Sequence, residues 1–451
     1  MIVSTAQADA TLNIKPGLHL VYNFREIMRE GRAPSLPILY TKGSHFDVGY
    51  ATGTTFSDRI RRYMQDDAIA SQPARQLYES RDGRELCDVL RKKGEDNFPL
   101  YAAEIRGLAA GVGVSYEEMF LQNSVLDIMN MDEFVVLDLL GKTVPLTRLL
   151  ERCSTVLLNR PDVKVIGHNE DDYTALQQYG YMVSAVVDDP DFPSILQGQG
   201  ANGYDDTAEG LSEDKCTSSR VERFTAYCYP GLLPGVAFSF NDHGLVFCIN
   251  SQTTDTIFCG APNACITRSL LGAASVEQCR HLLENRRRGG GSVGFSINIA
   301  DVKSPDVLWS AEVQPGLHGN KVHMHPVVEA AFGDMEDNGC YFQTNTYQHL
   351  SNSNKLYSHL QRPLARSSRA KEMFPCADEH DVLRVLGDTQ SNDEFVIFRR
   401  PSSSGEVTTC TTALFDVKGK RLDLYVDNPK SSLPLMSLPI QVERTNHSSE
   451  M

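Results

Sequence analysis

The sequence changes its pattern at Cys153, and this change constrains the fold more than any other feature. Before that position, apolar residues recur at helical spacings, starting after a predicted helix N-cap at Ser44. After it, short apolar runs alternate with turn residues, and residues 154–159 and 163–167 are typical of two strands joined by a turn. Helices followed by strands predict an α+β fold whose layers share a core.

Glycine positions extend the prediction in the helical part. Gly49 and Gly53 lie four residues apart, so we expect a second backbone to pack closely against that helix. Further helices are predicted over residues 99–111 and 264–287.

The chain has 451 residues, enough for one large core or two smaller ones. Its sequence contains no clean linker between two independent folds. We therefore expect one integrated domain, made of a mostly helical part, residues 1–152, and a strand-rich part, residues 153–451.

The chain is acidic, with 58 Asp and Glu against 43 Lys and Arg and a net charge of −15. Such a charge repels phosphates and disfavours nucleic acid as a partner. No run approaches the roughly 18 apolar residues of a membrane-spanning helix, and residues 1–14 lack the apolar run of a signal peptide. We therefore expect a cytoplasmic protein with no membrane partner. The 11 cysteines, an odd number, argue against a disulfide framework.

No motif indicates a cofactor or a metal. Gly289-Gly290-Gly291 ends a predicted helix instead of opening one, so it is not a phosphate loop. His323 and His325 are one residue apart on a predicted strand, with no further cluster of ligands beside them. We therefore expect neither a cofactor nor a metal.

Cys153 is the strongest candidate for a nucleophile. Two similar triplets exist, but the one at Cys216 leads into charged residues, and the one at Cys410 is followed by only 41 residues. Cys153 alone precedes a strand whose hairpin partner brings back acids, in the run Gly167-His168-Asn169-Glu170-Asp171-Asp172. A carboxylate or amide at that place can hold a free α-amino group or a substrate amine.

These residues resemble those of a known family. Cys153-Ser154-Thr155 and the run 167–171 are similar to the start of the mature large chain in the penicillin acyltransferase family of N-terminal-nucleophile hydrolases. Other segments that match are 244–250, 344–345, 367–369 and 412–416. The resemblance covers about residues 36–429 and implies a four-layer αββα N-terminal-nucleophile hydrolase fold.

The resemblance also implies a self-processing enzyme. The chain would be cut between Arg152 and Cys153, and the thiol of Cys153 would then act as nucleophile, with its own new α-amino group as base. Asn250 matches the family's oxyanion donor, Asp171 would position the α-amine or the substrate, and Arg369 would act electrostatically at the site. The cleaved N-terminal chain would stay bound as a partner.

Residues 36–46 and those around Cys153 resemble most a branch of the family that hydrolyses β-alanyl amides of biogenic amines, such as N-β-alanyl-dopamine and N-β-alanyl-histamine. For such a substrate, Glu170 or Asp172 would bind the β-alanyl ammonium group. Two alternatives stay open: acyl transfer with coenzyme A, through the same thioester, and an unprocessed chain that binds a ligand without turnover. The second alternative rests on Arg152, because family members carry glycine there, which tolerates the strained backbone that self-cleavage exploits.

Overall fold

The computed structural model describes the chain in thirteen segments, which form two β-sheets and the helices that cover them. These segments are residues 20–22, 36–65, 75–76, 78–129, 153–174, 176–189, 221–252, 260–286, 289–331, 339–351, 360–390, 396–400 and 407–442. The nine-stranded sheet, called sheet A, has the order β1 (Leu20–Tyr22), β2 (Ile38–Gly43), β5 (Tyr181–Asp188), β6 (Val221–Cys228), β7 (Phe238–Asn241), β8 (Leu245–Gln252), β9 (Gly294–Asp301), β10 (Val307–Gln314) and β11 (Lys321–Val328). The six-stranded sheet, called sheet B, has the order β12 (Cys340–Gln343), β3 (Ser154–Asn159), β4 (Lys164–Tyr173), β13 (Val407–Asp416), β14 (Arg421–Tyr425) and β15 (Met436–Pro439).

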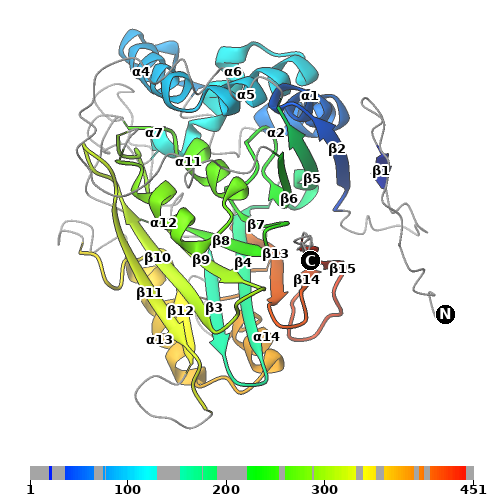
Figure 1. The fold of residues 1–451 in the computed structure, drawn as a ribbon, viewed down its shortest axis with the longest axis vertical. Helices are drawn as coiled ribbons and strands as arrows, with labels where there is room; N and C mark the ends of the chain where they lie inside the picture. The colour runs from blue at the N-terminus through cyan, green and yellow to red at the C-terminus, as the bar shows by residue number, and fades with distance from the viewer. Residues whose placement is uncertain are drawn as a thin grey trace, which may run out of the picture.

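Helices lie on the outer faces of both sheets. Those that contribute to the core on the outer face of sheet A are α1 (His45–Thr55), α2 (Ser57–Gln65), α4 (Arg81–Asn97), α5 (Pro99–Val112), α6 (Tyr116–Asn123), α7 (Val125–Met129), α11 (Asn263–Ser269), the 3₁₀ helix η3 (Leu270–Gly272) and α12 (Val276–Glu284). Those that pack on sheet B are α13 (Gln361–Met373) and α14 (Glu379–Leu386). The short helix α9 (Leu176–Tyr179) joins β4 to β5. In Figure 1, α4, α5 and α6 gather at the end of the molecule opposite α13 and α14.

Three apolar layers separate the four structural layers. The middle layer lies between the sheets and contains Leu157 of β3 and Phe238 of β7. Val156, the neighbour of Leu157, points instead to the layer between sheet B and α14, where Val382 lies. This alternation follows from the two-residue repeat of a strand buried on both faces. The order helix, sheet, sheet, helix confirms the predicted four-layer αββα fold.

Close packing of α1 on α5 confirms the expectation drawn from the paired glycines. A Cβ added at Gly49 would lie 2.0 Å from the carbonyl oxygen of Glu104, and one added at Gly53 would lie 2.4 Å from that of Leu108. Any larger residue would therefore push the two helices apart. The predicted N-cap is also confirmed, since the side chain of Ser44 accepts a hydrogen bond from the backbone N–H of Asp47.

The single helix predicted over 264–287 is wrong. The chain forms α11, a short 3₁₀ turn and then α12, which begins after a new N-cap at Ser275. The side chain of Ser275 accepts a hydrogen bond from the backbone N–H of Gln278 at 3.1 Å, and this cap starts a helix in a new direction.

The core on the outer face of sheet A draws on residues from both sides of position 153. Ile105 of α5 and Phe247 of β8 both belong to it. Residues 130–152 lie outside the described residues, so the division of the chain at Arg152 stays a prediction.

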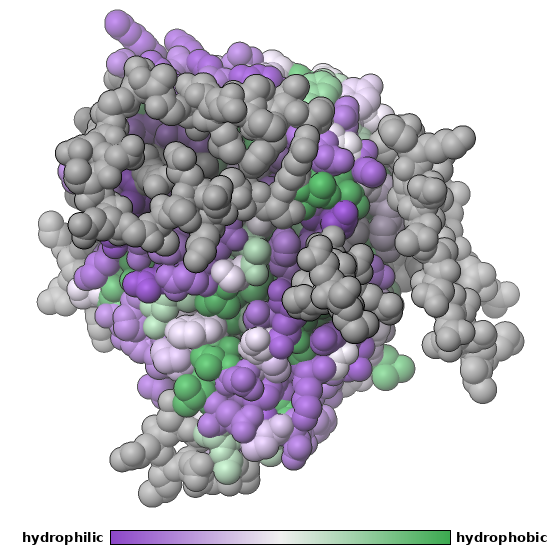
Figure 2. Space-filling view, in the orientation of Figure 1, coloured by the Kyte–Doolittle hydropathy of each residue, from purple (hydrophilic) through white to green (hydrophobic). Residues whose placement is uncertain are grey.

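Hydrophilic residues cover much of the face in Figure 2, with smaller hydrophobic areas between them. Within the described segments, none of the helices combines the length and the apolar character needed to cross a membrane.

Candidate active site

Cys153 lies directly before the first residue of β3, with its side chain on the face of sheet B that looks toward sheet A. Thr155 and Leu157 share this face, because alternate residues of a strand point the same way. Cys153 is 6% exposed, and its Sγ lies 3.6 Å from Oε1 of Glu170 on the neighbouring strand β4. The register, with Ser154 opposite Asn169, brings these two residues together.

The surroundings of Cys153 keep its thiol protonated. Burial raises the pKa of Cys153 well above its ordinary value, and the nearby carboxylates of Glu170 and Asp171 raise it further. A thiolate nucleophile at this position therefore needs a base that takes the proton during the reaction.

A hydrogen-bonded chain links Glu170 to Asn250 in sheet A. Oε2 of Glu170 lies 3.1 Å from Nε2 of His168, and Nδ1 of His168 lies 2.8 Å from the hydroxyl oxygen of Thr155. The Thr155 hydroxyl donates its hydrogen to Oδ1 of Asn250 at 2.8 Å. Since the Thr155 hydroxyl has one hydrogen, it must accept from His168, so Nδ1 of His168 carries a proton.

Asn250 presents a buried donor that no other described residue uses. Its Oδ1 also accepts from Nδ2 of Asn298 at 3.0 Å, and these two bonds fix the orientation of the amide. Its Nδ2 is buried and has no hydrogen-bond partner among the described residues. Buried amide donors are normally paired, and an unpaired one suits a ligand or a developing oxyanion.

Asp171 points to the opposite face of sheet B from Glu170, because the two residues are adjacent on β4. Its Oδ1 accepts from the hydroxyl of Thr409 at 2.6 Å, and its Oδ2 lies 3.7 Å from Nε of Arg399. Burial raises the pKa of Asp171 to about 6, although Arg399 and Arg366 lower it. Oδ2 has no hydrogen-bond partner among the described residues, so a cationic group could bind there.

The second candidate for substrate binding, Asp172, shares the inward face of β4 with Glu170. It is 6% exposed, and its Oδ1 accepts from the backbone N–H of Tyr173 at 2.6 Å. The hydroxyl of Tyr229 donates to Oε1 of Glu170, next to the contact with Cys153. The inward face therefore holds two carboxylates, a phenol and the thiol.

The structure brings Arg366, and not Arg369, to Cys153. Nη1 of Arg366 donates to the carbonyl oxygen of Cys153 at 2.7 Å and to the hydroxyl of Ser154 at 2.8 Å. Nη2 donates to Oδ1 of Asn345 at 2.7 Å. Arg369, one turn along α13, binds Asp388 at 2.9 Å instead. We therefore assign the electrostatic role expected for Arg369 to Arg366, as a proposal.

Helical periodicity could have identified Arg366. Pro363, Arg366 and Ala370 are the buried residues of α13, and they form one stripe at spacings of three and four. An arginine inside an apolar stripe is rarely a surface residue and requires buried partners.

The remaining predicted residues lie elsewhere or outside the described part. Arg152, the expected cleavage position, and the look-alike Cys216 lie outside the described residues. Cys410 lies in β13 and is buried, and its Sγ contacts the carbonyl oxygens of Tyr173 and Thr408, each at 3.6 Å.

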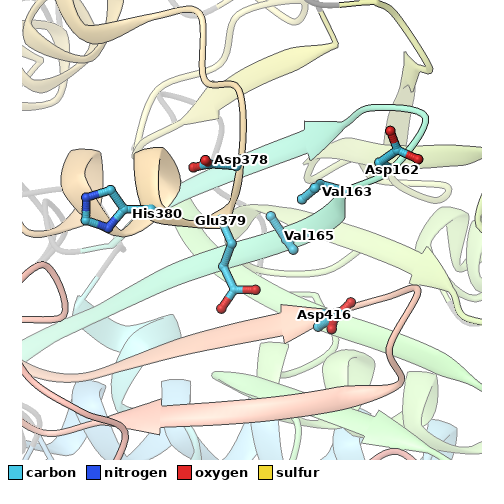
Figure 3. Close-up of a pocket in the computed structure, with 7 residues that line it drawn as sticks. All are labelled: Asp162, Val163, Val165, Asp378, Glu379, His380 and Asp416. Carbon is cyan, nitrogen blue, oxygen red and sulfur yellow. The ribbon is translucent and has the colours of Figure 1, made fainter.

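A surface hollow lies at the other end of the β3–β4 hairpin from Cys153 (Figure 3). Its lining residues are Asp162, Val163, Val165, Asp378, Glu379, His380 and Asp416. Its place at the hairpin turn separates it from the thiol, and we assign it no role.

Two stacked sheets between helices, with a cysteine at the head of a strand in one sheet, are the arrangement of N-terminal-nucleophile hydrolases. The sequence model of the family described as acyl-coenzyme A:6-aminopenicillanic acid acyl-transferase matches residues 158–431. The chain therefore belongs to this family of enzymes, and the resemblance seen in the sequence is confirmed.

Three proteins of known name are similar to this chain. The beta-alanyl-dopamine/carcinine hydrolase of Drosophila melanogaster is 27% identical over 419 residues, which cover 91% of this chain and 97% of that protein. Among solved structures, penicillin V acylase from Agrobacterium tumefaciens matches 61% of this chain and 82% of its own, with 10% identity and a TM-score of 0.30. The R18L variant of conjugated bile acid hydrolase from Clostridium perfringens matches 66% of this chain and 100% of its own, with 11% identity and a TM-score of 0.32.

Proposed function

We propose that this chain is a self-processing cysteine amidohydrolase that cleaves β-alanyl amides of biogenic amines. The observation that carries the proposal is the buried contact of Cys153 with Glu170, in a chain similar to a protein named beta-alanyl-dopamine/carcinine hydrolase. The thiol supplies a nucleophile, and the carboxylate beside it supplies a group that can bind a substrate ammonium.

Processing would begin with the thiol of Cys153. Its sulfur attacks the carbonyl carbon of Arg152, a C–S bond forms, and the peptide C–N bond breaks as the amine takes the thiol proton. Water then hydrolyses the thioester, which releases the carboxylate of Arg152 and returns the thiol. The product chain begins with a free α-amino group, whose ordinary pKa of roughly 7.7–8.0 suits a general base near neutral pH.

Turnover would use the same groups on an external amide. The α-amine takes the proton of the Cys153 thiol, whose pKa is raised, and the thiolate attacks the carbonyl carbon of the β-alanyl group. The oxyanion accepts a hydrogen bond from Nδ2 of Asn250, and the biogenic amine leaves with the proton. Water then cleaves the thioester and releases β-alanine. Arg366 is a positioning residue here, because it holds the carbonyl oxygen of Cys153.

Charge on the inward face of β4 favours a substrate with one ammonium group. Glu170 lies beside Cys153, and Asp172 adds a second carboxylate on the same face. The β-alanyl ammonium, two carbons from the reacting carbonyl, would bind to these carboxylates, and an acetyl group would not.

The test is to measure release of dopamine or histamine from the β-alanyl amides, with and without coenzyme A, and from N-acetyl-dopamine. We expect release without coenzyme A and a much slower reaction of the acetyl analogue. Equal rates on both acyl groups would contradict the ammonium site while leaving the nucleophile assignment intact.

Glu170→Gln isolates the ammonium contact. A hydrogen bond to a charged group contributes about 1.5–3 kcal/mol, so KM for the β-alanyl amide should rise roughly 10- to 100-fold. The turnover number should fall less, because the ammonium is bound about equally in the ground and transition states. The matched control is N-acetyl-dopamine. Because Glu170 also raises the pKa of the Cys153 thiol, a change common to both substrates reports the thiol, and the additional loss on the β-alanyl amide reports the ammonium contact.

Acyl transfer is the second candidate, because the family model that matches is described as an acyl-coenzyme A acyl-transferase. The thioester on Cys153 is common to both reactions, and the acceptor decides between them. Release that requires coenzyme A would favour the transferase. The third candidate, an unprocessed chain that only binds ligand, would appear as a single uncut mass without turnover.

A further inference from the structure

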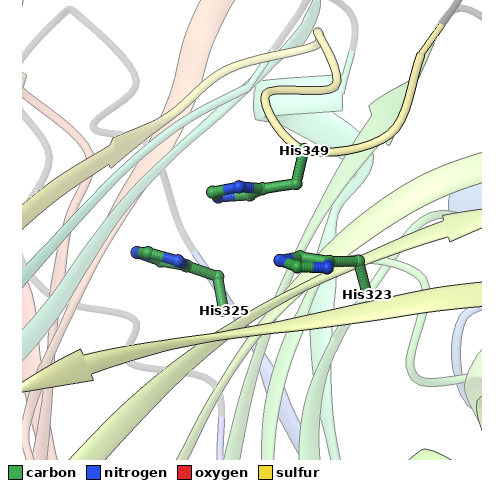
Figure 4. A group of neighbouring side chains, drawn as sticks. All are labelled: His323, His325 and His349. Atoms are coloured by element: carbon green, nitrogen blue, oxygen red, sulfur yellow. The ribbon is translucent and has the colours of Figure 1, made fainter.

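Three histidines form a cluster at the edge of sheet A, outside the candidate active site. His323 and His325 lie on the same face of β11, and His349 lies in the segment that follows β12. The ring of His349 stacks on both others, with centroids 4.5 Å from His323 and 4.4 Å from His325. Figure 4 shows the three rings gathered around one space. One ring nitrogen of each lies within 4.8 Å of the others.

A buried carboxylate holds His349 over the strand. Glu312 of β10 lies opposite His323 in the register and is fully buried. Its carboxylate accepts the backbone N–H groups of Gln348, His349 and Leu350, the last two at 3.0 and 2.7 Å. Three such bonds fix the backbone that carries the third histidine, so the cluster is built into the fold.

We propose that His323, His325 and His349 bind one divalent transition-metal ion of the zinc type. Imidazole is a preferred ligand for such ions, and three histidines with an open fourth position are a known ligand set for zinc. Alkaline-earth ions, which prefer oxygen ligands, are excluded by the same chemistry.

Binding requires a small adjustment of side chains. Ligand nitrogens around zinc lie at about 2.0–2.1 Å from the metal, which places them roughly 3.3 Å apart in a tetrahedron. The nitrogens here must therefore approach by about 1.5 Å from their present limit of 4.8 Å. Rotation of the His349 ring out of its stack achieves this, because this side chain is exposed and its backbone stays pinned by Glu312.

The metal would stiffen a segment that reaches the candidate active site. Gln343 of β12 pairs with Thr155, and Asn345 accepts a hydrogen bond from Arg366, which holds the carbonyl of Cys153. The inference itself does not depend on the proposed function, since its readout is metal binding and thermal stability.

The experiment titrates metal-stripped full-length protein with Co²⁺, followed by visible absorption, and with Zn²⁺, followed by calorimetry and by the melting temperature. We expect one equivalent to bind, without a thiolate-to-cobalt absorption band, and to raise Tm. His349→Ala should lower the affinity at least tenfold and abolish the rise in Tm. His318→Ala, at an exposed histidine outside the cluster, is the matched control and should change neither.

A second group of possible ligands, Cys153, His168 and Glu170, must be distinguished. Cys153→Ser should leave the one-equivalent binding intact. The proposal is overturned if no saturable binding occurs, if His349→Ala binds like the parent chain, or if Cys153→Ser removes the binding and a thiolate band reports the bound metal.

Discussion

Replacement of Asn250 by alanine tests whether its side-chain amide stabilises the oxyanion of the proposed reaction. The amide nitrogen is buried and has no hydrogen-bond partner among the described residues, while its oxygen accepts from Thr155 and Asn298. Asn250→Ala therefore removes two separate contributions: the donor that we propose for the oxyanion, and an acceptor that satisfies two buried donors.

The two contributions predict two magnitudes. Loss of one oxyanion donor typically costs about 2.7–4 kcal/mol of barrier stabilisation, so kcat should fall roughly 100- to 1000-fold with KM little changed. Loss of the acceptor leaves the hydroxyl of Thr155 and the amide of Asn298 unsatisfied, at roughly 1–3 kcal/mol each, so unfolding free energy should fall by roughly 2–6 kcal/mol. Asn298→Ala is the matched control, because it removes one bond to Asn250 and leaves the free donor in place.

The assay measures amine release per cleaved molecule, well below the melting temperature of each variant, with the cleaved fraction taken from intact mass. Asn298→Ala should lower the free energy of unfolding, but its kcat should fall less than tenfold. A kcat for Asn250→Ala within threefold of the parent enzyme, or a change confined to KM, would refute the oxyanion role.

The remaining predictions concern the nucleophile, its support and its pH dependence. Intact mass should show chains of 152 and 299 residues, and Cys153→Ala should abolish cleavage and turnover while the buried Cys410→Ala does neither. Arg366→Met should lower activity at least 100-fold and stability by roughly 3 kcal/mol or more, because it removes charged hydrogen bonds from a buried site, whereas Arg369→Met should change activity little. The pKa of Asp171 is raised to about 6, so kcat/KM should fall as the pH is lowered through 6, because the carboxyl then loses the charge that would hold an α-ammonium. Asp171→Asn should lower the rate strongly and should also remove this acidic limb of the pH profile. An unchanged pH profile in that variant would assign the limb to another group.

Sequence patterns predicted the structure correctly where the interacting residues lie close together in the chain. The strand predicted at 154–159 coincides with β3, because the turn residues and apolar run that define it lie within ten residues. The same hairpin fixes the meeting of Cys153 and Glu170, since a turn at 161–162 determines which residues face each other. The start of α12 could also have been predicted, because Ser275 and Gln278 have the spacing of an N-cap and its partner.

Contacts between distant segments could not be derived from spacing. Asn250 faces Thr155 across the space between two sheets, and only the family resemblance suggested its role. Helical periodicity separates the buried Arg366 from the partly exposed Arg369, but it does not tell which distant residues Arg366 contacts. His349 joins His323 and His325 only because Glu312 binds the backbone of a segment far along the chain.

Successive residues of β4 point to opposite faces of sheet B, so the acidic residues near Cys153 lie on two different faces. The outer face holds Asp171 with Arg366 and Arg399, so cations already lie beside its carboxylate and partly offset the rise in pKa that burial causes. The inner face holds Glu170, whose contacts are Cys153, His168 and Tyr229, with neither lysine nor arginine among them in the described residues. Asp172 lies on the same inner face, so two carboxylates of β4 lie on the side of the thiol. An uncharged acyl group bound there would desolvate these carboxylates without a new ionic contact, whereas a β-alanyl group would bring an ammonium group to them. Selection between acyl groups would thus arise from the two-residue repeat of β4, the strand that lies beside the proposed nucleophile.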